Sequence, residues 1–532
     1  MATPTERADG SQSIYEFLTG SAKAYGDKTA FTCGPMQLSF SRMVELGDAL
    51  AAYLQSVGVK KGDGVALMSP NLLAFPIATL GIQRTGAVQV NVNPLYTATE
   101  LEHQLNDAGV ETMIIFSGTS EAFSAVRTKT KVKRVIVIHV GDGSGMDVPS
   151  PPPHEGIGDH VLFADALTQG AEMVFEPVKV ARDDLALLQY TGGTTGPSKG
   201  AMLTHHNVLS NAAQAYRADP NIFVDGQEVI VTAIPMYHIF ALTVNFIMYV
   251  GCGGTNVLIT NPRDMDAFVG SLKGAGFSVM TGVNSLFAGL SLHPEFPQTD
   301  FSRVKACING GTAAMEATSD KWQSIVGVPL IQGYGLSETA PILTLAQSGE
   351  TVFTGHIGTA VPDTEIKLLD ADDNEVPLGE RGELVARGPQ VTRGYYQRPE
   401  ATAEAFTSDG FFRTGDIAIA QEGGFYKIVD RKKDMVIVSG FNVYPNDVEQ
   451  VASNCEGVVE CACLGVPDAK TGEAVKLFAV KAKGSAVTEE DIIAYCREHM
   501  TAYKVPKQIE FIDEVPKSAV GKMLRRVLRD GA

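Results

Sequence analysis

The stretch GVALMSPNLLAFPIATLGIQRTGAVQVNV, residues 64–92, combines two kinds of hydrophobic pattern. Residues 64–70 and 87–92 are short and mostly apolar, which is typical of strands buried on both faces. Between them, residues 72–83 have apolar side chains at helical spacing. A strand, a helix and a second strand in this order predict two parallel strands joined by a crossover helix.

The same alternation continues further along the chain. Residues 112–116 and 134–140 are two more apolar runs, and TATE at residues 97–100 is a capping-box signature that opens a helix carrying Leu101 and Leu105. Strands that alternate with helices predict a largely parallel sheet covered by helices on both faces. We therefore expect an α/β fold for most of the chain.

A change in composition near the C-terminus suggests a second domain, as the length of 532 residues also does. The charge cluster DRKKD, residues 430–434, is followed by two further strand patterns and by a capped helix that starts at Thr488. This is enough sequence for a small α+β domain. We predict a large N-terminal α/β domain over residues 1–430, a hinge over residues 431–434 and a small C-terminal α+β domain over residues 435–532.

The composition excludes several classes of protein. Hydrophobic residues make up 44% of the chain and charged residues 20%, as in an ordinary folded protein. The net charge of −18 argues against non-specific binding of nucleic acid, which needs clustered cations. A local group of lysines and backbone N–H groups can still bind an anion. Seven cysteines without a C-x-x-C pair predict buried, reduced thiols.

The N-terminus and the longest apolar stretch bear on localisation. The first twelve residues are polar and lack the apolar core of a signal peptide. Residues 239–250 are apolar but interrupted by Thr243 and Asn245, and the stretch is too short to span a bilayer. We expect a cytoplasmic protein, with peripheral contact at the inner face of the membrane as an open alternative.

The segment YTGGTTGPSKG, residues 190–200, follows the apolar run at residues 185–189. Its glycines allow close approach of the backbone to a ligand, and its hydroxyl groups and lysine supply donors. A strand followed by such a loop predicts binding of a polyanion, although the Walker spacing is absent and a flexible turn is the alternative. The expected ligand residues are Thr191, Gly192, Gly193, Thr194, Thr195, Gly196 and Lys199.

With AMLTHHN at residues 201–207, this loop resembles the nucleotide loop of the adenylate-forming enzymes. These include acyl-CoA synthetases, peptide-synthetase adenylation domains and beetle luciferases. The resemblance covers nearly the whole chain, and the segment PMYHIFALTVN at residues 235–245 is similar to bacterial long-chain fatty-acid–CoA ligases in particular. Further matching segments are QGYGLSET (332–339), RTGDI (413–417), FYKIVDRKKDMVIVSGFNVYPNDVE (425–449) and PKSAVGKMLRR (516–526), and the last two are also similar to the bacterial long-chain ligases in particular.

The resemblance implies a reaction in two halves. A carboxylate attacks the α-phosphorus of ATP to give an acyl-adenylate and pyrophosphate, and the thiol of coenzyme A then displaces AMP. Bringing two anions together depends mainly on neutralising charge and on positioning. By resemblance, the catalytic residues are Lys522, Glu338 and His238, and Mg²⁺ is held by Glu338, with the hydroxyl of Thr191 as a weaker candidate.

The resemblance also assigns residues to the nucleotide. Tyr334 would lie against adenine, with Gly333 and Gly335 leaving room for it. Asp416 would accept both ribose hydroxyls, and Arg431 would contact the ribose and phosphate region. Ordinary turn residues are the alternative at these positions. The remaining nucleotide positions are Gly310, Gly311 and Thr339.

The charge cluster resembles the hinge on which a mobile C-terminal domain rotates between the two half-reactions. Lys433 occupies the pivot position. Rotation would replace Lys522 at the active site by the segment around Gly440, which matches the glycine beside the pantetheine channel of coenzyme A. A solvated run of charges is the alternative interpretation.

The acyl pocket is the least specific part of the resemblance. Residues 236–242 would lie near the substrate carboxylate, and they contain no acid, which argues against an amino-acid substrate. Their apolar side chains suit an alkyl tail but also an ordinary core, and His238 is compatible with a purely structural role. We expect a medium- to long-chain fatty acid, activated by a monomer or homodimer. The alternatives are an aryl- or short-chain acid CoA ligase, a fatty acyl-AMP ligase that loads a carrier protein, a luciferase-like enzyme and a silent regulator.

Overall fold

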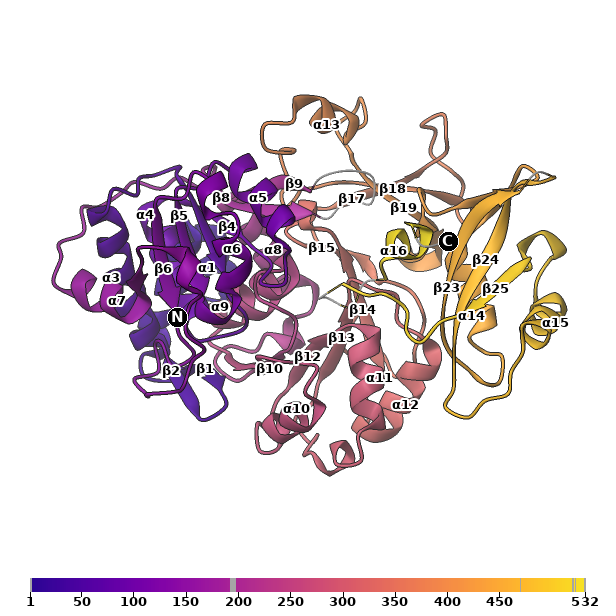
Figure 1. Ribbon diagram of the computed structural model, residues 1–532, viewed down its shortest axis with the longest axis horizontal. Helices are drawn as coiled ribbons and strands as arrows, with labels where there is room; N and C mark the ends of the chain where they lie inside the picture. The colour runs from indigo at the N-terminus through magenta and orange to yellow at the C-terminus, as the bar shows by residue number, and fades with distance from the viewer. Residues whose placement is uncertain (1, 192–197, 469, 519–520, 522, 531–532) are drawn as a thin grey trace. The chain divides into compact units, whose positions relative to one another are not determined.

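The computed structural model describes residues 2–191, 198–468, 470–518, 521 and 523–530 (Figure 1). The chain forms two compact units, and the second of them includes strands that precede residue 431. The predicted domains, 1–430 and 435–532 with a hinge at 431–434, are parts expected to rotate relative to each other. This division stays a prediction. The first unit comprises Met1–Thr354, Ala360–Thr364 and Arg387–Thr407, and the second comprises Gly355–Thr359, Glu365–Ala386 and Ser408–Ala532.

One sheet of the first unit contains the strands predicted between residues 64 and 140, which are confirmed. The strand order is β7-β6-β5-β3-β4-β8-β9, and all neighbours are parallel except β8 and β9. β3 ends at Met68, before Pro70, which has no N–H to continue the ladder. The strands are β3 (Gly64–Met68), β4 (Val88–Asn91), β5 (Thr112–Phe116), β6 (Arg134–Ile138), β7 (Val161–Leu162), β8 (Leu185–Thr191) and β9 (Lys199–Thr204).

Helices cover both faces of this sheet, as predicted. In β3, Leu67 packs into the core formed with α3, α4 and α7, whereas Met68 packs into a separate core formed with α5 and α6. The predicted capping box is present, because Thr97 Oγ1 accepts from Glu100 N and Glu100 Oε2 accepts from Thr97 N. These helices are α3 (Phe40–Ser56), α4 (Ala74–Thr85), α5 (Ala98–Asp107), α6 (Ser120–Ser124) and α7 (Phe163–Ala171).

The other sheet of the first unit has the order β15-β14-β13-β12-β10-β11-β1-β2. β10, β12, β13 and β14 are parallel, so their carboxyl ends share one edge, where ligands usually bind in such sheets. Gly310 and Gly335 end β13 and β14. The strands are β1 (Thr29–Cys33), β2 (Met36–Ser39), β10 (Val229–Thr232), β11 (Thr255–Leu258), β12 (Val279–Gly282), β13 (Ala306–Gly310), β14 (Leu330–Gly335) and β15 (Ile342–Leu345).

The remaining helices of the first unit belong mostly to the segments between these strands. Glycine ends α12, since Gly327 adopts a left-handed conformation with φ +92° directly after the helix. The helices are α1 (Pro4–Gly10), α2 (Ile14–Tyr25), α8 (His205–Ala218), α9 (Tyr249–Gly251), α10 (Met265–Leu272), α11 (Asn284–Leu292), α12 (Glu316–Val326) and α13 (Pro399–Glu404).

The apolar stretch that follows β10 is buried and helical. Ala241–Met248 forms a π-helix, a form that is frequent at functional sites. Asn245, which interrupts the apolar run, donates to Val231 O at 3.2 Å and to Thr281 Oγ1 at 2.8 Å, so it fixes this helix to β10 and β12. Among the described residues, no helix combines the length and the apolarity that crossing a membrane requires.

The second unit contains two sets of paired strands. β18 and β20 each pair antiparallel with β19, and β17 lies next to β18. A separate sheet has the order β22-β21-β24-β23, with β25 beside β24, and α14 and α15 contribute to its core. The helix predicted after Thr488 is confirmed, with a capping box to Asp491. The elements are β16 (Thr359–Ala360), β17 (Glu365–Leu369), β18 (Arg381–Arg387), β19 (Phe412–Gln421), β20 (Phe425–Arg431), β21 (Val436–Val438), β22 (Phe441–Val443), α14 (Pro445–Ala452), β23 (Val458–Asp468), β24 (Gly472–Lys481), α15 (Glu489–His499), β25 (Gln508–Phe511) and α16 (Arg525–Asp530).

The cysteines are buried, as predicted. All seven are buried, and none forms a disulfide. Burial raises the pKa of the Cys307 thiol to about 12 and that of Cys496 to about 11. These side chains therefore stay protonated at neutral pH and behave as small apolar groups.

Candidate functional site

The predicted phosphate loop connects two antiparallel strands of the first unit. β8 ends at Thr191 and β9 begins at Lys199, and these residues face each other across the strand pair. Thr191 Oγ1 donates to Lys199 O at 3.5 Å, so this hydroxyl is directed at the backbone of the neighbouring strand. The predicted ligand residues Gly192, Gly193, Thr194, Thr195 and Gly196 lie outside the described residues.

Residues on both sides of the loop are anchored to α5. Tyr190 Oη donates to Asp107 Oδ2 at 2.8 Å, and Arg398 forms an ion pair with the same aspartate. At the end of the loop, His103 Nε2 donates to Ser198 O at 3.0 Å, which requires the proton on Nε2. Sequence reasoning missed these anchors, because they join segments that are far apart in the chain.

A chain of buried amides connects the strand before the loop to the predicted acyl segment. Gln89 Nε2 donates to Asn91 Oδ1 at 2.8 Å, and Asn91 Nδ2 donates to Gln189 Oε1 at 2.9 Å. Gln189 Nε2 in turn donates to Tyr237 O at 3.1 Å. Because all four residues are buried, these hydrogen bonds set the position of the acyl segment relative to β8.

Glu338 lies in a tight turn after β14 and is only 7% exposed. Thr339 is fully buried, and its Oγ1 accepts from Leu336 N at 2.9 Å and donates to Leu336 O at 3.1 Å. The predicted nucleotide residue Thr339 therefore holds the turn that carries Glu338. Gly335 has a backbone role as well, since a Cβ atom there would lie 1.7 Å from Pro341 O.

Tyr395, which was not predicted from the sequence, contacts Glu338 directly. Its Oη donates to Glu338 Oε1 at 2.8 Å, while Thr392 N donates to Glu338 O at 2.7 Å. Lys199 Nζ lies 5.4 Å from the centroid of the Tyr395 ring. Burial, together with the charge of Glu338, raises the pKa of Tyr395, so its hydroxyl stays a donor. The sequence feature that could have pointed to Tyr395 is the pair of tyrosines in an otherwise polar loop, residues 392–398.

The predicted adenine residues lie on β14 and on the segment after β13. Tyr334 is half-buried and faces Thr344 of β15. The two segments are tied together by Gln332 Oε1, which accepts from Ala314 N at 3.0 Å. Gly311 has φ +77°, a conformation that favours glycine, whereas Gly333 lies within β14.

The predicted acyl and adenine segments meet where Phe240 packs on Gly310. The Phe240 ring lies so close to Gly310 that a Cβ atom there would be 2.7 Å from Phe240 Cε1. Phe240 N donates to His238 Nδ1 at 3.3 Å, so the neutral imidazole carries its proton on Nε2. Asn71 Oδ1 accepts from Met236 N at 2.8 Å and fixes the start of this segment. Gly310 is therefore required by packing against Phe240.

In the second unit, the predicted ribose residues face each other across β19 and β20. Asp416 is 5% exposed, and its Oδ1 lies 3.4 Å from Arg431 Nε. Thr414 Oγ1 accepts from Asp416 N at 3.1 Å and holds the backbone at this point. A cavity of about 280 Å³ opens beside these residues. Its lining residues are Thr414, Gly415, Asp416, Arg431, Lys432 and Lys433.

The acids of the predicted hinge cluster are buried, unlike those of a solvated charge run. Asp430 accepts a hydrogen bond from Asn446 N at 2.7 Å, and burial raises its pKa to about 6. Asp434 lies 3.5 Å from Arg525, which also pairs with Glu449 at 2.7 Å. Arg525 belongs to the segment PKSAVGKMLRR, so two of the predicted motifs meet in the second unit.

Gly440 occupies the hairpin between β21 and β22. Val438 and Phe441 pair directly, which leaves Ser439 (φ +51°) and Gly440 (φ +83°) as the two turn residues. Two positive φ angles are typical of a type I′ turn and favour glycine. No described atom lies within 4 Å of where a Cβ on Gly440 would be. Lys522, the predicted adenylation residue, lies outside the described residues.

The predicted magnesium site fits the residues of the first unit. Among the described residues, no three His, Cys, Asp or Glu side chains cluster so that they could hold a metal by themselves. Magnesium bound together with ATP needs fewer protein ligands, because phosphate oxygens and water complete its shell. The carboxylate of Glu338, oriented by a neutral hydroxyl, has the chemistry for such a site.

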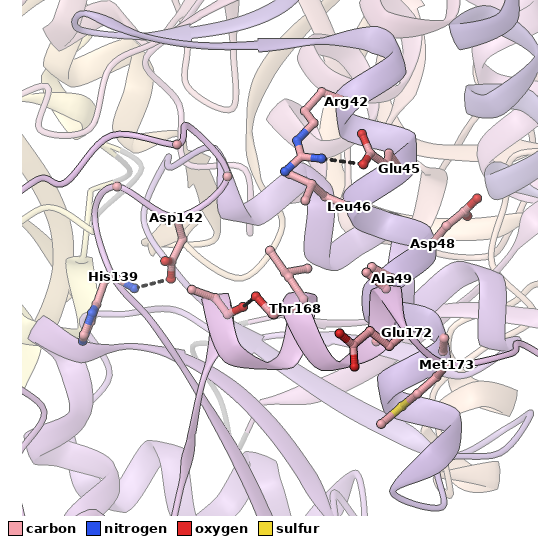
Figure 2. A pocket seen from close by; sticks show the side chains of 18 of the residues that line it. Arg42, Glu45, Leu46, Asp48, Ala49, His139, Asp142, Thr168, Glu172 and Met173 are labelled. Carbon is pink, nitrogen blue, oxygen red and sulfur yellow. Dashed lines mark hydrogen bonds and ion pairs between the residues drawn. The ribbon is translucent and has the colours of Figure 1, made fainter.

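A larger cavity of the first unit contains none of the predicted site residues. It measures about 900 Å³ and lies among α3, α7 and the loop over residues 139–148 (Figure 2). Arg42 pairs with Glu45 at its rim, and Asp142 accepts from His139 N at 2.7 Å (Figure 2). Its two arginines, Arg42 and Arg84, are each paired with an acid of α3, Glu45 and Asp48, so the cavity is a poor match for a phosphate.

Comparisons with known proteins agree with the motifs. The AMP-binding enzyme family matches residues 18–396, and the AMP-binding enzyme C-terminal domain matches residues 447–522. A long-chain-fatty-acid–CoA ligase of Salmonella typhimurium (strain LT2) is 48% identical over 536 residues, covering 98% of this chain and 95% of the relative. The ligase of the same name from Escherichia coli O6:H1 is 46% identical over 542 residues, covering 99% and 96%.

A solved structure extends this likeness to the fold. The ATP-bound crystal structure of MatB from Rhodopseudomonas palustris matches with a TM-score of 0.86 and 27% identity over 98% of each chain. The sequence resemblance and the predicted α/β fold with a smaller C-terminal domain are thus confirmed. This chain belongs to the AMP-binding enzyme family of adenylate-forming proteins, and within it is most like the bacterial long-chain fatty-acid–CoA ligases.

Proposed function

We propose that this chain is an acid–thiol ligase that activates a medium- to long-chain fatty acid with ATP and transfers it to coenzyme A. The intermediate is an acyl-adenylate, and the products are acyl-CoA, AMP and pyrophosphate. The observation that carries the proposal is 48% identity across 98% of the chain to the long-chain-fatty-acid–CoA ligase of Salmonella typhimurium. Similarity over this length supports a shared reaction as well as a shared fold.

The acyl segment argues against an amino-acid substrate. Residues 236–242 contain no acid that could pair with the ammonium group of an amino acid. Ile239 and Leu242 are buried in the apolar core, and the half-buried Phe240 ring packs on Gly310 where the acyl and adenine segments meet. His238 lies beside this ring and would orient the substrate carboxylate from Nε2.

In the first half-reaction, the chain's own groups neutralise and position two anions. Lys199 and the backbone N–H groups of the phosphate loop bind phosphate, and Lys522 balances the charge that develops as the carboxylate attacks. Asp416 accepts the ribose hydroxyls, and Tyr334 lies against adenine. Magnesium, when bound with ATP, supplies further positive charge against the phosphate oxygens, and Glu338 is the residue that would hold it.

In the second half-reaction, residues 435–532 rotate about the hinge at residues 431–434. The segment around Gly440 then takes the place of Lys522 and admits the thiol of coenzyme A. The exposed hairpin that carries Gly440 supports this role, because the position leaves open space for a ligand. Lys433 is the pivot, next to the ion pair formed by the buried Asp434 and Arg525.

The experiment is pyrophosphate release from ATP and Mg²⁺ across a panel of acids, with and without coenzyme A. The panel runs from acetate to oleate and includes benzoate, coumarate and several amino acids. We expect release to be highest with acids of medium to long chain length, and a thioester to appear only when coenzyme A is added.

Other results would redirect the proposal. A maximum with aryl or short acids would keep the reaction and change the substrate class. Turnover that yields no CoA thioester would indicate a ligase that loads a carrier protein. No turnover with any acid would contradict an enzymatic role and favour a silent regulator.

A further inference from the structure

Residues 392–398, which we call the tyrosine segment, hold Glu338 at two points. Thr392 N donates to the main-chain oxygen of Glu338 at 2.7 Å, and Tyr395 Oη donates to its side-chain Oε1 at 2.8 Å. One bond fixes the backbone and the other fixes the carboxylate. A side chain held in this way has little rotational freedom. A group that binds a ligand in one defined geometry needs such a fixed orientation.

The same segment also contacts the chain on both sides of the phosphate loop. Tyr396 N donates to Gly200 O at 2.8 Å, directly after the loop. Arg398 pairs with Asp107, which accepts from Tyr190 Oη, directly before the loop. The tyrosine segment therefore connects Glu338 to both strands that carry the loop.

The hydrogen bond from Tyr395 orients Glu338 without neutralising it. A phenol is an uncharged donor, whereas a lysine or arginine in its place would offset the negative charge that attracts a metal ion. Lys199 is a cation next to Tyr395, and its Nζ lies 5.4 Å from the ring centroid. The ring thus contacts a phosphate-loop lysine on its face while its hydroxyl binds the acid.

We propose that Tyr395 is a positioning residue that orients the carboxylate of Glu338 toward magnesium-bound ATP. The proposal rests on the proposed function, which assigns magnesium to Glu338. It predicts that loss of the Tyr395 hydroxyl weakens binding of ATP only when magnesium is present. A residue with a merely structural role would change binding of both forms of ATP equally.

The test is calorimetric titration of ATP into the full-length protein without fatty acid, once with Mg²⁺ and once with EDTA. Tyr395→Phe removes the hydroxyl and keeps the ring beside Lys199. Since a hydrogen bond to a charged group is lost, we expect about tenfold weaker binding of magnesium-ATP. Binding in EDTA should change less than about twofold, within the spread of ordinary surface changes. Tyr396→Phe is the matched control, since that ring packs against an apolar core, and both affinities should stay unchanged.

Two further variants separate the inference from the proposed function. Glu338→Gln should remove the gain in affinity that magnesium gives, and adding Tyr395→Phe to it should cause no further loss, because the tyrosine acts through the acid. If Glu338→Gln leaves the magnesium effect intact, the metal role in the proposed function is wrong, and this inference is wrong with it.

If Glu338→Gln removes the magnesium effect and Tyr395→Phe does not, only the role of Tyr395 is wrong. Equal weakening with and without magnesium in Tyr395→Phe would also overturn it. Should Tyr395→Phe fail to fold, Glu338→Asp is the alternative, because it keeps the charge but withdraws the carboxylate from the hydroxyl. ATP should then bind more weakly by the same factor, again only when magnesium is present. An unchanged magnesium effect in Glu338→Asp would contradict the inference.

Discussion

Two acids of the candidate site, one in each unit, are held in different ways. Glu338 in the first unit is 7% exposed and accepts a hydrogen bond from the neutral hydroxyl of Tyr395. Asp416 in the second unit is 5% exposed and lies 3.4 Å from the guanidinium of Arg431. Each carboxylate therefore lies beside a group that can orient it, but the two groups differ in charge.

This difference matches the ligands that we assign to the two acids. A neutral donor leaves the negative charge of a carboxylate available, which suits a cation such as Mg²⁺. An arginine offsets the charge but leaves oxygen lone pairs that can accept from ribose hydroxyls. If the two acids differ in this way, substitutions at Glu338 should change the magnesium requirement and substitutions at Asp416 should not.

The largest effect is expected for Lys522, because neither carboxylate can replace a cation at the attacked phosphorus. Lys522→Ala should slow adenylation by about 10²–10³, the range for loss of one group that stabilises transition-state charge. Thioester formation from supplied acyl-adenylate should be much less affected. The measurement is single-turnover kinetics of each half-reaction, and equal loss in both would contradict the role of Lys522.

The next effect concerns the acid of the first unit. Glu338→Gln removes the charge but keeps a side chain of the same shape. We expect adenylation to fall on the order of a hundredfold at saturating ATP, with a higher magnesium concentration needed for half-maximal rate. Pyrophosphate release measured over a range of Mg²⁺ concentrations tests this, and an unchanged magnesium requirement would remove the distinction between the two acids.

The acid of the second unit should respond differently. Asp416→Asn should raise KM for ATP by about tenfold, because a charged acceptor of hydrogen bonds is lost, and should leave the magnesium requirement unchanged. The preference for ATP over 2′-deoxy-ATP should shrink as well. Steady-state kinetics with both nucleotides provide the measurement. A shifted magnesium requirement, or an intact preference, would argue against a ribose-binding role.

The smallest effect is expected at a glycine. The two units each contain one glycine of the candidate site that can be compared, Gly335 in the first unit and Gly440 in the second. Gly335 has no room for a Cβ atom, whereas Gly440 has open space and a positive φ angle. Gly440→Ala should therefore cost only about 1 kcal/mol of stability, from its backbone conformation. Gly440→Leu carries the same backbone strain and a larger side chain, so Ala is its matched control.

If Gly440 lies beside the path of coenzyme A, Leu should slow thioester formation well beyond Ala while pyrophosphate release stays similar. Equal rates of thioester formation in the two variants would contradict the channel. Thermal melting of both proteins checks that they fold alike.

The sequence predicted features that depend on near neighbours in the chain. The capping box at Thr97 and Glu100 needs only three residues of separation, and the buried strand at residues 64–70 is visible as an apolar run. The arrangement of these strands in a sheet covered on both faces follows from their alternation with helices. These predictions rest on the spacing of apolar residues and on helix-capping residues, which are local properties of the sequence.

Contacts between residues that are far apart in the sequence were not predictable from the local pattern of apolar and capping residues. Tyr395 and Glu338 are 57 positions apart, and Arg398 and Asp107 are 291 positions apart. The resemblance to a family identified Glu338 but carried no information on what orients it. Likewise, the close approach of Pro341 to Gly335 is a property of the folded backbone.

The step that defines the proposed reaction is attack of the fatty-acid carboxylate at the α-phosphorus of ATP. The most direct test uses palmitate labelled with ¹⁸O in both carboxylate oxygens, together with ATP, Mg²⁺ and coenzyme A. If an acyl-adenylate forms, one labelled oxygen stays on phosphorus when the thiol displaces AMP, so mass spectrometry should find one ¹⁸O in AMP. Unlabelled AMP, with the label in phosphate or pyrophosphate, would contradict the account.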